Sequence, residues 1–363
     1  IESRVGREKL ESFLIELLEQ HRFQAISAKD FIQDMQRSLG VDLTKELDSW
    51  FSNTKIPAFN FSDFKNYKVL DGDRQRFQVI FTVYNPADVD GVVVVDFFIP
   101  RGGPGGRGGG FGRFSMGPSD YERAVYVPAG AAKQIAIVTD DQPRAVTINT
   151  LVSQNLPSQT IHRFEEFEEN NRAQPMDHER LLDEPPRLAL PGEFIVDNED
   201  EGFKVLSETK RTPLQRLLKI STEEEEYRRF SPWRPPQNWA KTINSIFYGD
   251  LVHSAHYMRS GDGENKVAWQ VDLPNAGQYA VYAYGEPQPM RGRSRRGRSF
   301  VKEFHYSVFH DDGVEEVEWS SESAEGWNFL GSYYFSAGAN KVELSNKSEG
   351  RMVTADAVKW VKR

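Results

Sequence analysis

The segment Val267–Ala283 reads VAWQVDLPNAGQYAVYA, and apolar residues recur at every second position on both sides of its centre. Alternation with a period of two is typical of a β-strand that buries one face. The residues Pro274–Gly277 interrupt this pattern with turn-forming side chains, and the alternation resumes at Tyr279. The segment therefore predicts one strand, a turn and a returning strand.

The same pattern continues on both sides of this segment, which predicts a β-sandwich over residues 193–363. Further strands are expected around Phe304–Val308 and Val314–Trp319, with Asp312-Gly313 as the hairpin turn between them. A last strand is expected over Met352–Trp360. The insertion Ser207–Arg229 is highly charged and is expected to be helical.

Residues 59–160 also alternate with a period of two, and they predict a second sandwich of the immunoglobulin-like type. Short apolar runs separated by turn residues give the expected strands. These are Phe77–Tyr84, Val92–Ile99, Tyr121–Val127, Lys133–Thr139 and Ala145–Thr150. The run Val92–Ile99 is apolar almost throughout, which predicts a strand covered on both faces.

Residues 1–58 instead show helical periodicity. Apolar residues from Leu10 to Leu18 form one stripe, and a second helix is expected to begin after an N-cap at Ser27 and to end at Gly40. A third, short helix is expected to carry Leu43 to Phe51. Three such helices bury little surface, so we expect them to complete a helical domain that continues before Ile1, in a chain cut from a longer one.

Residues 161–192 predict a linker. They are first acidic and then rich in proline, a composition that favours a semi-extended chain over a packed core. Phe164 and Phe167 are the side chains expected to hold this linker against a neighbouring domain.

The composition excludes several functional classes. The 363 residues carry a net charge of −9, which disfavours nucleic acid and anionic membrane as partners. No apolar run approaches the roughly 20 residues that a membrane-spanning helix needs. The chain has no cysteine, so disulfides, thiolate metal sites and cysteine nucleophiles are all absent.

Candidate metal and catalytic motifs are weak. A zinc peptidase helix needs H-E-x-x-H, but the pair His178-Glu179 is followed by Leu182 at the fifth position, among prolines. His253 and His256 lie three apart, and a structural role is favoured for both. The oxygen-bearing side chains able to hold calcium are better explained as caps of strands and turns; they are Asp197, Asn198, Asp200 and Asp356.

Two segments rich in glycine and arginine, Arg101–Phe114 and Arg291–Arg298, interrupt the β pattern. Solvated loops at hairpin tips are the expectation that we favour. Docking on an acidic partner, or on the glutamate runs of this chain, is the alternative. A phosphate-binding loop is not indicated, because neither segment ends in Gly-Lys-Ser/Thr before a helix.

Six of the seven tryptophans lie in residues 193–363. Trp269 and Trp327 are expected in the core, because each stands within an apolar strand pattern. Trp233 and Trp239 lie in the irregular stretch PWRPPQNW, and they are the tryptophans expected to be exposed. Exposed tryptophan can stack against pyranose rings, so these two are the predicted ligand-binding residues.

Residues 193–363 resemble the golvesin C-terminal, or xanthan lyase carbohydrate-binding-like, domain. The matching residues are Val196-Asp197-Asn198, Gly202-Phe203, Trp269, Leu273-Pro274, Gly277, Tyr279, Val281, Trp327, Leu330-Gly331, Tyr333, Phe335, Gly338 and Ala355-Asp356-Ala357-Val358. The segments Ser207–Arg229 and Arg291–Arg298 depart from the family pattern. The resemblance implies a jelly-roll-like sandwich on an exported bacterial protein.

The first 160 residues resemble the region that follows the catalytic site in zinc aminopeptidases of the aminopeptidase N family. The matching residues are Ser27–Phe31, Leu39–Leu43, Trp50-Phe51, Ile56-Pro57, Ile148–Thr150 and Asn155–Pro157. The metal-binding motif of that family is missing here, so no catalytic residue carries over. Any zinc of such a parent protein would lie upstream of Ile1, and no cofactor is expected in this chain.

The sequence as a whole predicts a mainly β, non-catalytic C-terminal portion of an exported zinc-aminopeptidase-like protein, periplasmic or at the cell surface. Its expected role is to support the peptidase and to bind a surface, a glycan or a partner. One alternative is a stand-alone carbohydrate-binding or adhesive module. The other is an assembly subunit that docks through the glycine- and arginine-rich segments.

Overall fold

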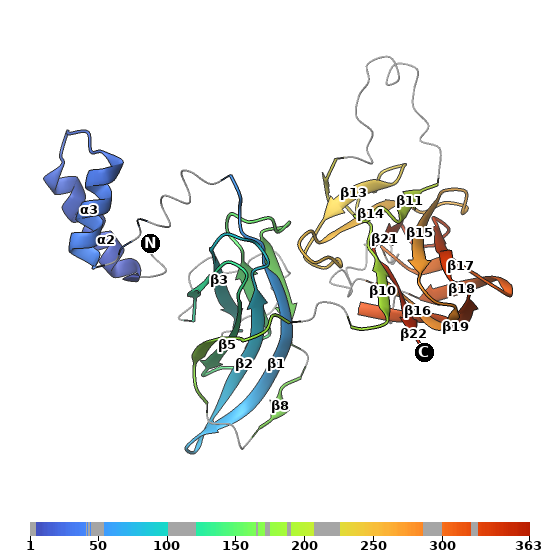
Figure 1. Ribbon diagram of the computed structural model, residues 1–363, viewed down its shortest axis with the longest axis horizontal. Helices are drawn as coiled ribbons and strands as arrows, with labels where there is room; N and C mark the ends of the chain where they lie inside the picture. Colours follow the sequence, from blue (N-terminus) through green and yellow to red (C-terminus); the bar gives the residue numbers. More distant parts are fainter. Residues whose placement is uncertain are drawn as a thin grey trace, which may run out of the picture. The chain divides into compact units, whose positions relative to one another are not determined.

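The computed structural model is mainly β, and it divides the chain into two compact units, Ile1–Pro186 and Arg187–Arg363 (Figure 1). No helix among the described residues is long and apolar enough to span a bilayer. The predicted third helix apart from Thr44, both glycine- and arginine-rich segments and residues 207–225 lie outside the described residues. The structure describes residues 5–40, 42, 44, 54–100, 121–164, 166–170, 175–186, 190–206, 226–285, 300–320 and 326–363.

Two helices, α2 (Arg7–Gln20) and α3 (Ala28–Leu39), pack against each other in the first unit. The predicted cap is confirmed, since the Ser27 hydroxyl accepts a hydrogen bond from the backbone N–H of Asp30 at 3.2 Å. Gly40 ends α3 in the left-handed conformation, also as predicted. The buried side chains of this pair are Phe13 and Met35; Leu10 and Leu17 pack against them half-buried, while Leu14 and Leu18 of the α2 stripe remain exposed.

The immunoglobulin-like part of the first unit consists of two sheets that share one core. One sheet has the order β8-β1-β2-β5-β9 and the other has the order β4-β3-β6-β7. The first sheet contains β1 (Asn60–Asp71), β2 (Arg74–Tyr84), β5 (Ala132–Thr139), β8 (Glu168–Glu169) and β9 (His178–Leu181). The second contains β3 (Gly91–Phe98), β4 (Arg123–Val127), β6 (Ala145–Asn149) and β7 (Gln159–Arg163).

Strand β3 is not covered on both faces, so this detail of the sequence prediction is wrong. Val93, Val95 and Phe97 are buried, while the residues between them are only half-buried. Among the described residues no further layer covers the second face of β3, because the sheet is one layer of a two-layer sandwich. The apolar run therefore overstates the burial of this strand.

The segment predicted as a linker, residues 161–192, instead contributes strands to the first unit. Strand β7 runs to Arg163, β8 pairs in parallel with β1, and β9 pairs with β5. Phe167 is buried in the sandwich core and Phe164 packs against it, as the sequence led us to expect of both. The charges do not prevent pairing, because β7, β8 and β9 lie at sheet edges, where one side of each strand faces solvent.

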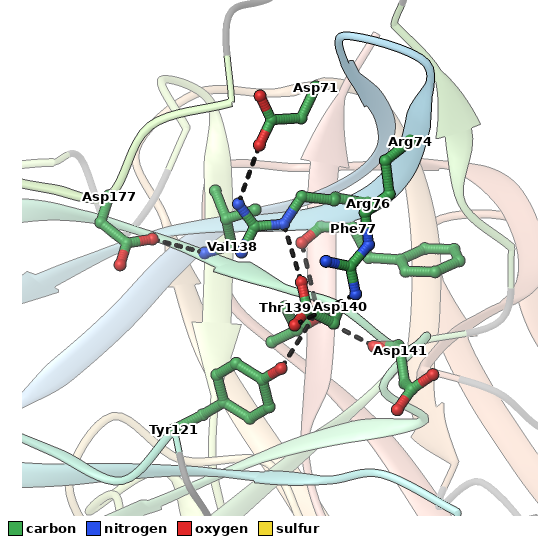
Figure 2. Close-up of polar contacts among 10 residues, drawn as sticks. All are labelled: Asp71, Arg74, Arg76, Phe77, Tyr121, Val138, Thr139, Asp140, Asp141 and Asp177. Atoms are coloured by element: carbon green, nitrogen blue, oxygen red, sulfur yellow. Dashed lines mark hydrogen bonds and ion pairs between the residues drawn. The ribbon is translucent and has the colours of Figure 1, made fainter.

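Polar contacts tie together the ends of β1, β2 and β5 (Figure 2). The guanidinium of Arg76 lies 3.1 Å from a carboxylate oxygen of Asp71 and 3.0 Å from one of Asp140, and Arg74 reaches Asp140 at 3.4 Å. The Tyr121 hydroxyl accepts a hydrogen bond from the backbone N–H of Asp140 at 3.0 Å. One carboxylate just after β5 is thus held by two arginines of β2.

The second unit contains three sheets, with orders β10-β22-β16-β19, β11-β15-β20-β17-β18 and β12-β13-β14-β21. The first contains β10 (Glu193–Val196), β16 (Gly277–Gly285), β19 (Gly326–Phe335) and β22 (Val358–Lys362). The second contains β11 (Phe203–Val205), β15 (Lys266–Leu273), β17 (Glu303–His310), β18 (Gly313–Ser320) and β20 (Gly338–Ser345). The third contains β12 (Arg228–Arg229), β13 (Ala240–Ile243), β14 (Ser254–Arg259) and β21 (Met352–Ala355).

The strand, turn and returning strand predicted for Val267–Ala283 are present as β15 and β16, but the two strands belong to different sheets. The turn between them therefore crosses from one layer of the sandwich to the other. Trp269 of β15 and Tyr279 of β16 both point into the shared core with no exposed surface. Strand β12, at Arg228–Arg229, pairs with β13, so the helix predicted through Arg229 is wrong at this end.

Candidate functional site

The second unit carries a groove of about 560 Å³ whose described lining is polar. Strands β17 and β18 supply Glu303, His305, Glu318 and Ser320. Lys302 stands just before β17. The loop between β14 and β15 supplies Gly261 and Asp262, and the loop between β20 and β21 supplies Lys347, Ser348 and Glu349.

Strand register places the carboxylates and hydroxyl of the groove together. In the β17–β18 hairpin Glu303 faces Ser320 and His305 faces Glu318. Their neighbours Phe304 and Tyr306 are buried in the core, so alternation sends the groove residues to the outer face of the sheet. The imidazole Nδ1 of His305 lies 3.9 Å from a carboxylate oxygen of Glu318.

The two loops beside the hairpin are held by hydrogen bonds of Asn346. Its side-chain oxygen accepts from the backbone N–H groups of Gly263 at 3.1 Å and Asn265 at 3.2 Å. The backbone N–H of Gly261 donates to the Asn346 carbonyl at 2.8 Å. A β-carbon at Gly261 would lie 2.4 Å from the Asn346 amide nitrogen, so glycine permits this close approach.

Opposite charges line the groove in contact with one another. The Lys302 ammonium pairs with the Glu349 carboxylate, and a Glu303 carboxylate oxygen accepts from the backbone N–H of Glu349. The hydrogen bond between Lys302 and Glu349 raises the pKa of the lysine and lowers the pKa of the glutamate. The groove therefore presents charged donors and acceptors side by side, which suits a ligand rich in hydroxyl groups.

Trp233, the first predicted ligand-binding residue, is 56% exposed, and it contacts two residues that are close in sequence to residues lining the groove. Its ring packs edge-on against Phe300, with 4.6 Å between centroids, and the Arg351 guanidinium lies 5.8 Å from its centroid. Phe300 and Arg351 are each two residues from a groove residue, Lys302 and Glu349 respectively. The indole is thus fixed in orientation and still accessible.

Trp239, the second predicted ligand-binding residue, is buried, so the expectation that it is exposed is wrong. It is 1% exposed and belongs to the core of the second unit. It directly precedes β13, and its apolar ring packs inward although the surrounding sequence is irregular. Trp269 is fully buried as predicted, whereas Trp327 is half-buried and lies outside the core, so the prediction of a core position is wrong for Trp327.

The acidic residues near Asn198 act as turn caps, as the sequence favoured. The Asp197 backbone N–H donates to the Asp200 carboxylate at 2.8 Å, and the Asn198 N–H donates to the Asp197 carboxylate at 2.8 Å. Burial, reinforced by the charges of Asp200, Glu199 and Asp250, raises the pKa of Asp197 to about 8. Among the described residues no group of three or more His, Asp or Glu side chains is arranged to hold a metal ion.

The histidines considered for a metal site occupy separate environments. His253 contacts the carbonyl oxygen of Phe247 at 2.8 Å, while His256 is buried on β14 against the ring of Phe203. Burial lowers the pKa of His253 and lowers that of His256 to about 3. His178 lies on strand β9 and not on a helix, in line with the prolines around it that oppose a helix.

Residues 233–362 match the Golvesin C-terminal domain. The resemblance seen in the sequence is thus supported for the second unit. No curated protein matches the chain. The comparisons give no support to the resemblance of the first 160 residues to zinc aminopeptidases.

Among solved structures, a Paenibacillus xanthan lyase is similar with a TM-score of 0.34 and 17% identity, over 86% of this chain and 27% of that chain. The mannan-binding module from Man5C has a TM-score of 0.22 and 12% identity, over 33% of this chain and 90% of that one. Arthrobacter globiformis isomalto-dextranase has a TM-score of 0.26 and 12% identity, over 98% and 48% respectively. Likenesses this distant identify no ligand.

Sequence reasoning found Trp233 but missed the groove beside it. The lining residues come from four separate segments, and none of these segments carries a recognisable motif. The one sequence signal for these lining residues is the hairpin turn between β17 and β18. The position of the turn determines which residues of the two strands face each other.

Proposed function

We propose that the second unit is a glycan-binding module that holds a short oligosaccharide in the groove, with one sugar ring stacked on Trp233. The observation that carries this proposal is an exposed, oriented indole beside a groove of charged and hydroxyl side chains. Sugars offer C–H faces to aromatic rings and hydroxyl groups to carboxylates and ammonium groups, so both features are used by one ligand.

The size and polarity of the groove support the same class of ligand. Its volume of about 560 Å³ falls within the roughly 300–1,000 Å³ that is usual for small-molecule sites. Such sites are usually mostly apolar, whereas the residues that line this groove are polar apart from one glycine. A polyhydroxylated ligand can satisfy these side chains when water leaves, and an apolar ligand cannot.

The proposed role is binding without catalysis. Export of the parent protein, and a peptidase domain upstream of residue 1, stay predictions.

A glycan array followed by calorimetry on the full chain tests the proposal. We expect an oligosaccharide to bind with a dissociation constant of millimolar or better, and Trp233→Ala to weaken binding roughly threefold to tenfold through lost stacking. Val314→Ala is the matched control, because Val314 is also exposed (51%) but lies at the opposite end of β18 from Ser320. Unchanged binding in the Trp233 variant would contradict the assignment.

A further inference from the structure

The outer face of the sheet β10-β22-β16-β19 carries a strip of aromatic side chains, here called the aromatic strip. In the β16–β19 pair Tyr282 faces Phe329 and Tyr284 faces Trp327. These two pairs are two residues apart along the strands, which is about 7 Å. The inner face of the same sheet holds the buried core residues Val281, Ala283, Leu330, Val358 and Trp360.

The rings of the strip contact one another, and each keeps part of its surface exposed to solvent. Tyr282 and Phe329 have centroids 5.4 Å apart, and Tyr284 and Trp327 have centroids 5.3 Å apart. Tyr248, from the segment after β13, extends the strip and lies 5.0 Å from Trp327. Phe329 is 53% exposed and the other four rings are half-buried. The strip is therefore a fixed surface of ring edges and faces.

The exposed apolar area is small for a protein interface. Aromatic side chains present about 150–250 Å² each, so one half-exposed and four mostly covered rings expose roughly 300 Å². A stable interface between two proteins buries about 800 Å² on each partner. A narrow ligand that runs along the strands uses the strip more fully than a second protein would.

The charges around the strip disfavour an acidic ligand. The Lys359 ammonium lies 4.8 Å from the Trp327 ring centroid, and it is neutralised by Glu193 at 3.1 Å. At the other end, burial together with the charges of Asp250 and nearby carboxylates raises the pKa of the Tyr248 hydroxyl. The surroundings of the strip are therefore neutral at the centre and negative at one end.

We propose that the aromatic strip is a second binding surface, which takes a chain of uncharged sugars that lies along β16 and β19 and stacks on Phe329 and Trp327. This surface is separate from the groove, because the groove lies on the outer face of the other large sheet of the unit. The groove would then hold a short oligosaccharide, and the aromatic strip would give the same unit an extended surface for a longer polysaccharide.

Affinity electrophoresis of the full chain tests the proposal. The gels contain hydroxyethylcellulose or galactomannan as neutral polymers, polygalacturonate as an acidic polymer and chitosan as a basic one. We expect at least one neutral polymer to retard the chain. Phe329→Ala should weaken that binding about threefold to tenfold, the loss of one stacking contact, with Val314→Ala as the unaffected control. Thermal unfolding of each variant shows whether the fold is kept.

The variant Trp233→Ala separates this proposal from the function of the groove. The strip proposal is supported if the neutral polymer still retards the Trp233→Ala variant and retards the double variant with Phe329→Ala less. Retardation that Trp233→Ala removes and Phe329→Ala leaves intact overturns the strip and keeps the groove. The strip proposal is also overturned if no neutral polymer retards the chain, or if only an acidic or basic polymer binds through Phe329. It is equally overturned if sedimentation shows self-association that Phe329→Ala abolishes.

Discussion

Truncation of Trp269 should destabilise the second unit strongly, because this side chain joins its two large sheets. The indole is fully buried on β15, and its N–H donates to the backbone carbonyl of Asp356 at 2.9 Å. Its ring packs edge-on against Phe203, with 5.5 Å between centroids. Asp356 lies in the two-residue link between β21 and β22, and β22 belongs to the opposite sheet, so one side chain supplies both core volume and a link between layers.

The expected magnitude follows from these two contributions. Trp269→Ala removes the ring from a packed core, which typically costs about 3–5 kcal/mol of unfolding free energy. Trp269→Phe keeps most of the volume but leaves the Asp356 carbonyl without this donor, which costs about 1–3 kcal/mol. The alanine variant should therefore be the more unstable of the two.

Hydrogen exchange of the full chain, read by mass spectrometry, measures this loss within each unit separately. Amides of β15 and β20 should exchange about tenfold faster for every 1.4 kcal/mol lost, while amides of β2 and β5 serve as the internal reference. A loss below about 1 kcal/mol for Trp269→Ala would refute the inference that this residue is a principal contact of the core. Equal costs for both variants would show that the hydrogen bond, and not the ring volume, dominates.

Two further variants test the electrostatics of each unit. The pKa of Asp197 is raised from 3.8 to about 8, so its contribution to stability is complete below about pH 4 and is lost as the pH rises toward 8. We expect Asp197→Asn to flatten the pH dependence of thermal unfolding over this window and to stabilise the second unit at its alkaline end; an unchanged profile would show that this carboxyl does not control it. In the first unit Asp140→Ala removes the partner of Arg74 and Arg76, and since these charges are partly exposed we expect a loss of about 1 kcal/mol or less in denaturant unfolding. Asp141→Ala is the control for Asp140→Ala. The backbone carbonyl of Asp141 accepts a hydrogen bond from the Thr139 hydroxyl, and the alanine variant keeps this carbonyl. A larger loss of unfolding free energy in Asp141→Ala than in Asp140→Ala would contradict the role given to Asp140.

The mainly β fold class was predictable because alternation is a local signal. The alternating residues of Val267–Ala283 are buried as predicted, and the helix cap at Ser27 and the stop at Gly40 were visible in short stretches of sequence. Which strands share a sheet was not visible. Strands β15 and β16 are adjacent in sequence, yet they pair with β20 and β19 respectively, because a sandwich needs connections that cross between its layers.

The candidate site was harder to predict, because it depends on register and on burial rather than on motifs. The expected turn at Asp312-Gly313 lies one residue beyond the observed loop, since His310 already faces Gly313. Such a shift changes the partner of every residue in the hairpin by two positions, and with it the set that lines the groove. Trp233 and Trp239 are separated by only five residues, and the sequence offered no way to tell that one is exposed and the other buried.

The two proposed binding surfaces lie on opposite layers of one sandwich, and this placement follows from the alternation that the sequence displays. Residues of β17 that face inward, such as Tyr306, meet residues of β16 that face inward, such as Tyr279, in a common core. His305, which is next to Tyr306, and Tyr282, which is next to the inward-facing Val281, must then point away from that core in opposite directions. A single short oligosaccharide therefore cannot touch both surfaces, whereas two chains, or one long chain that passes around the module, can. Substitutions at Trp233 and Phe329 should accordingly act independently on binding of a short ligand, and coupling between them would show that the two surfaces are part of one site.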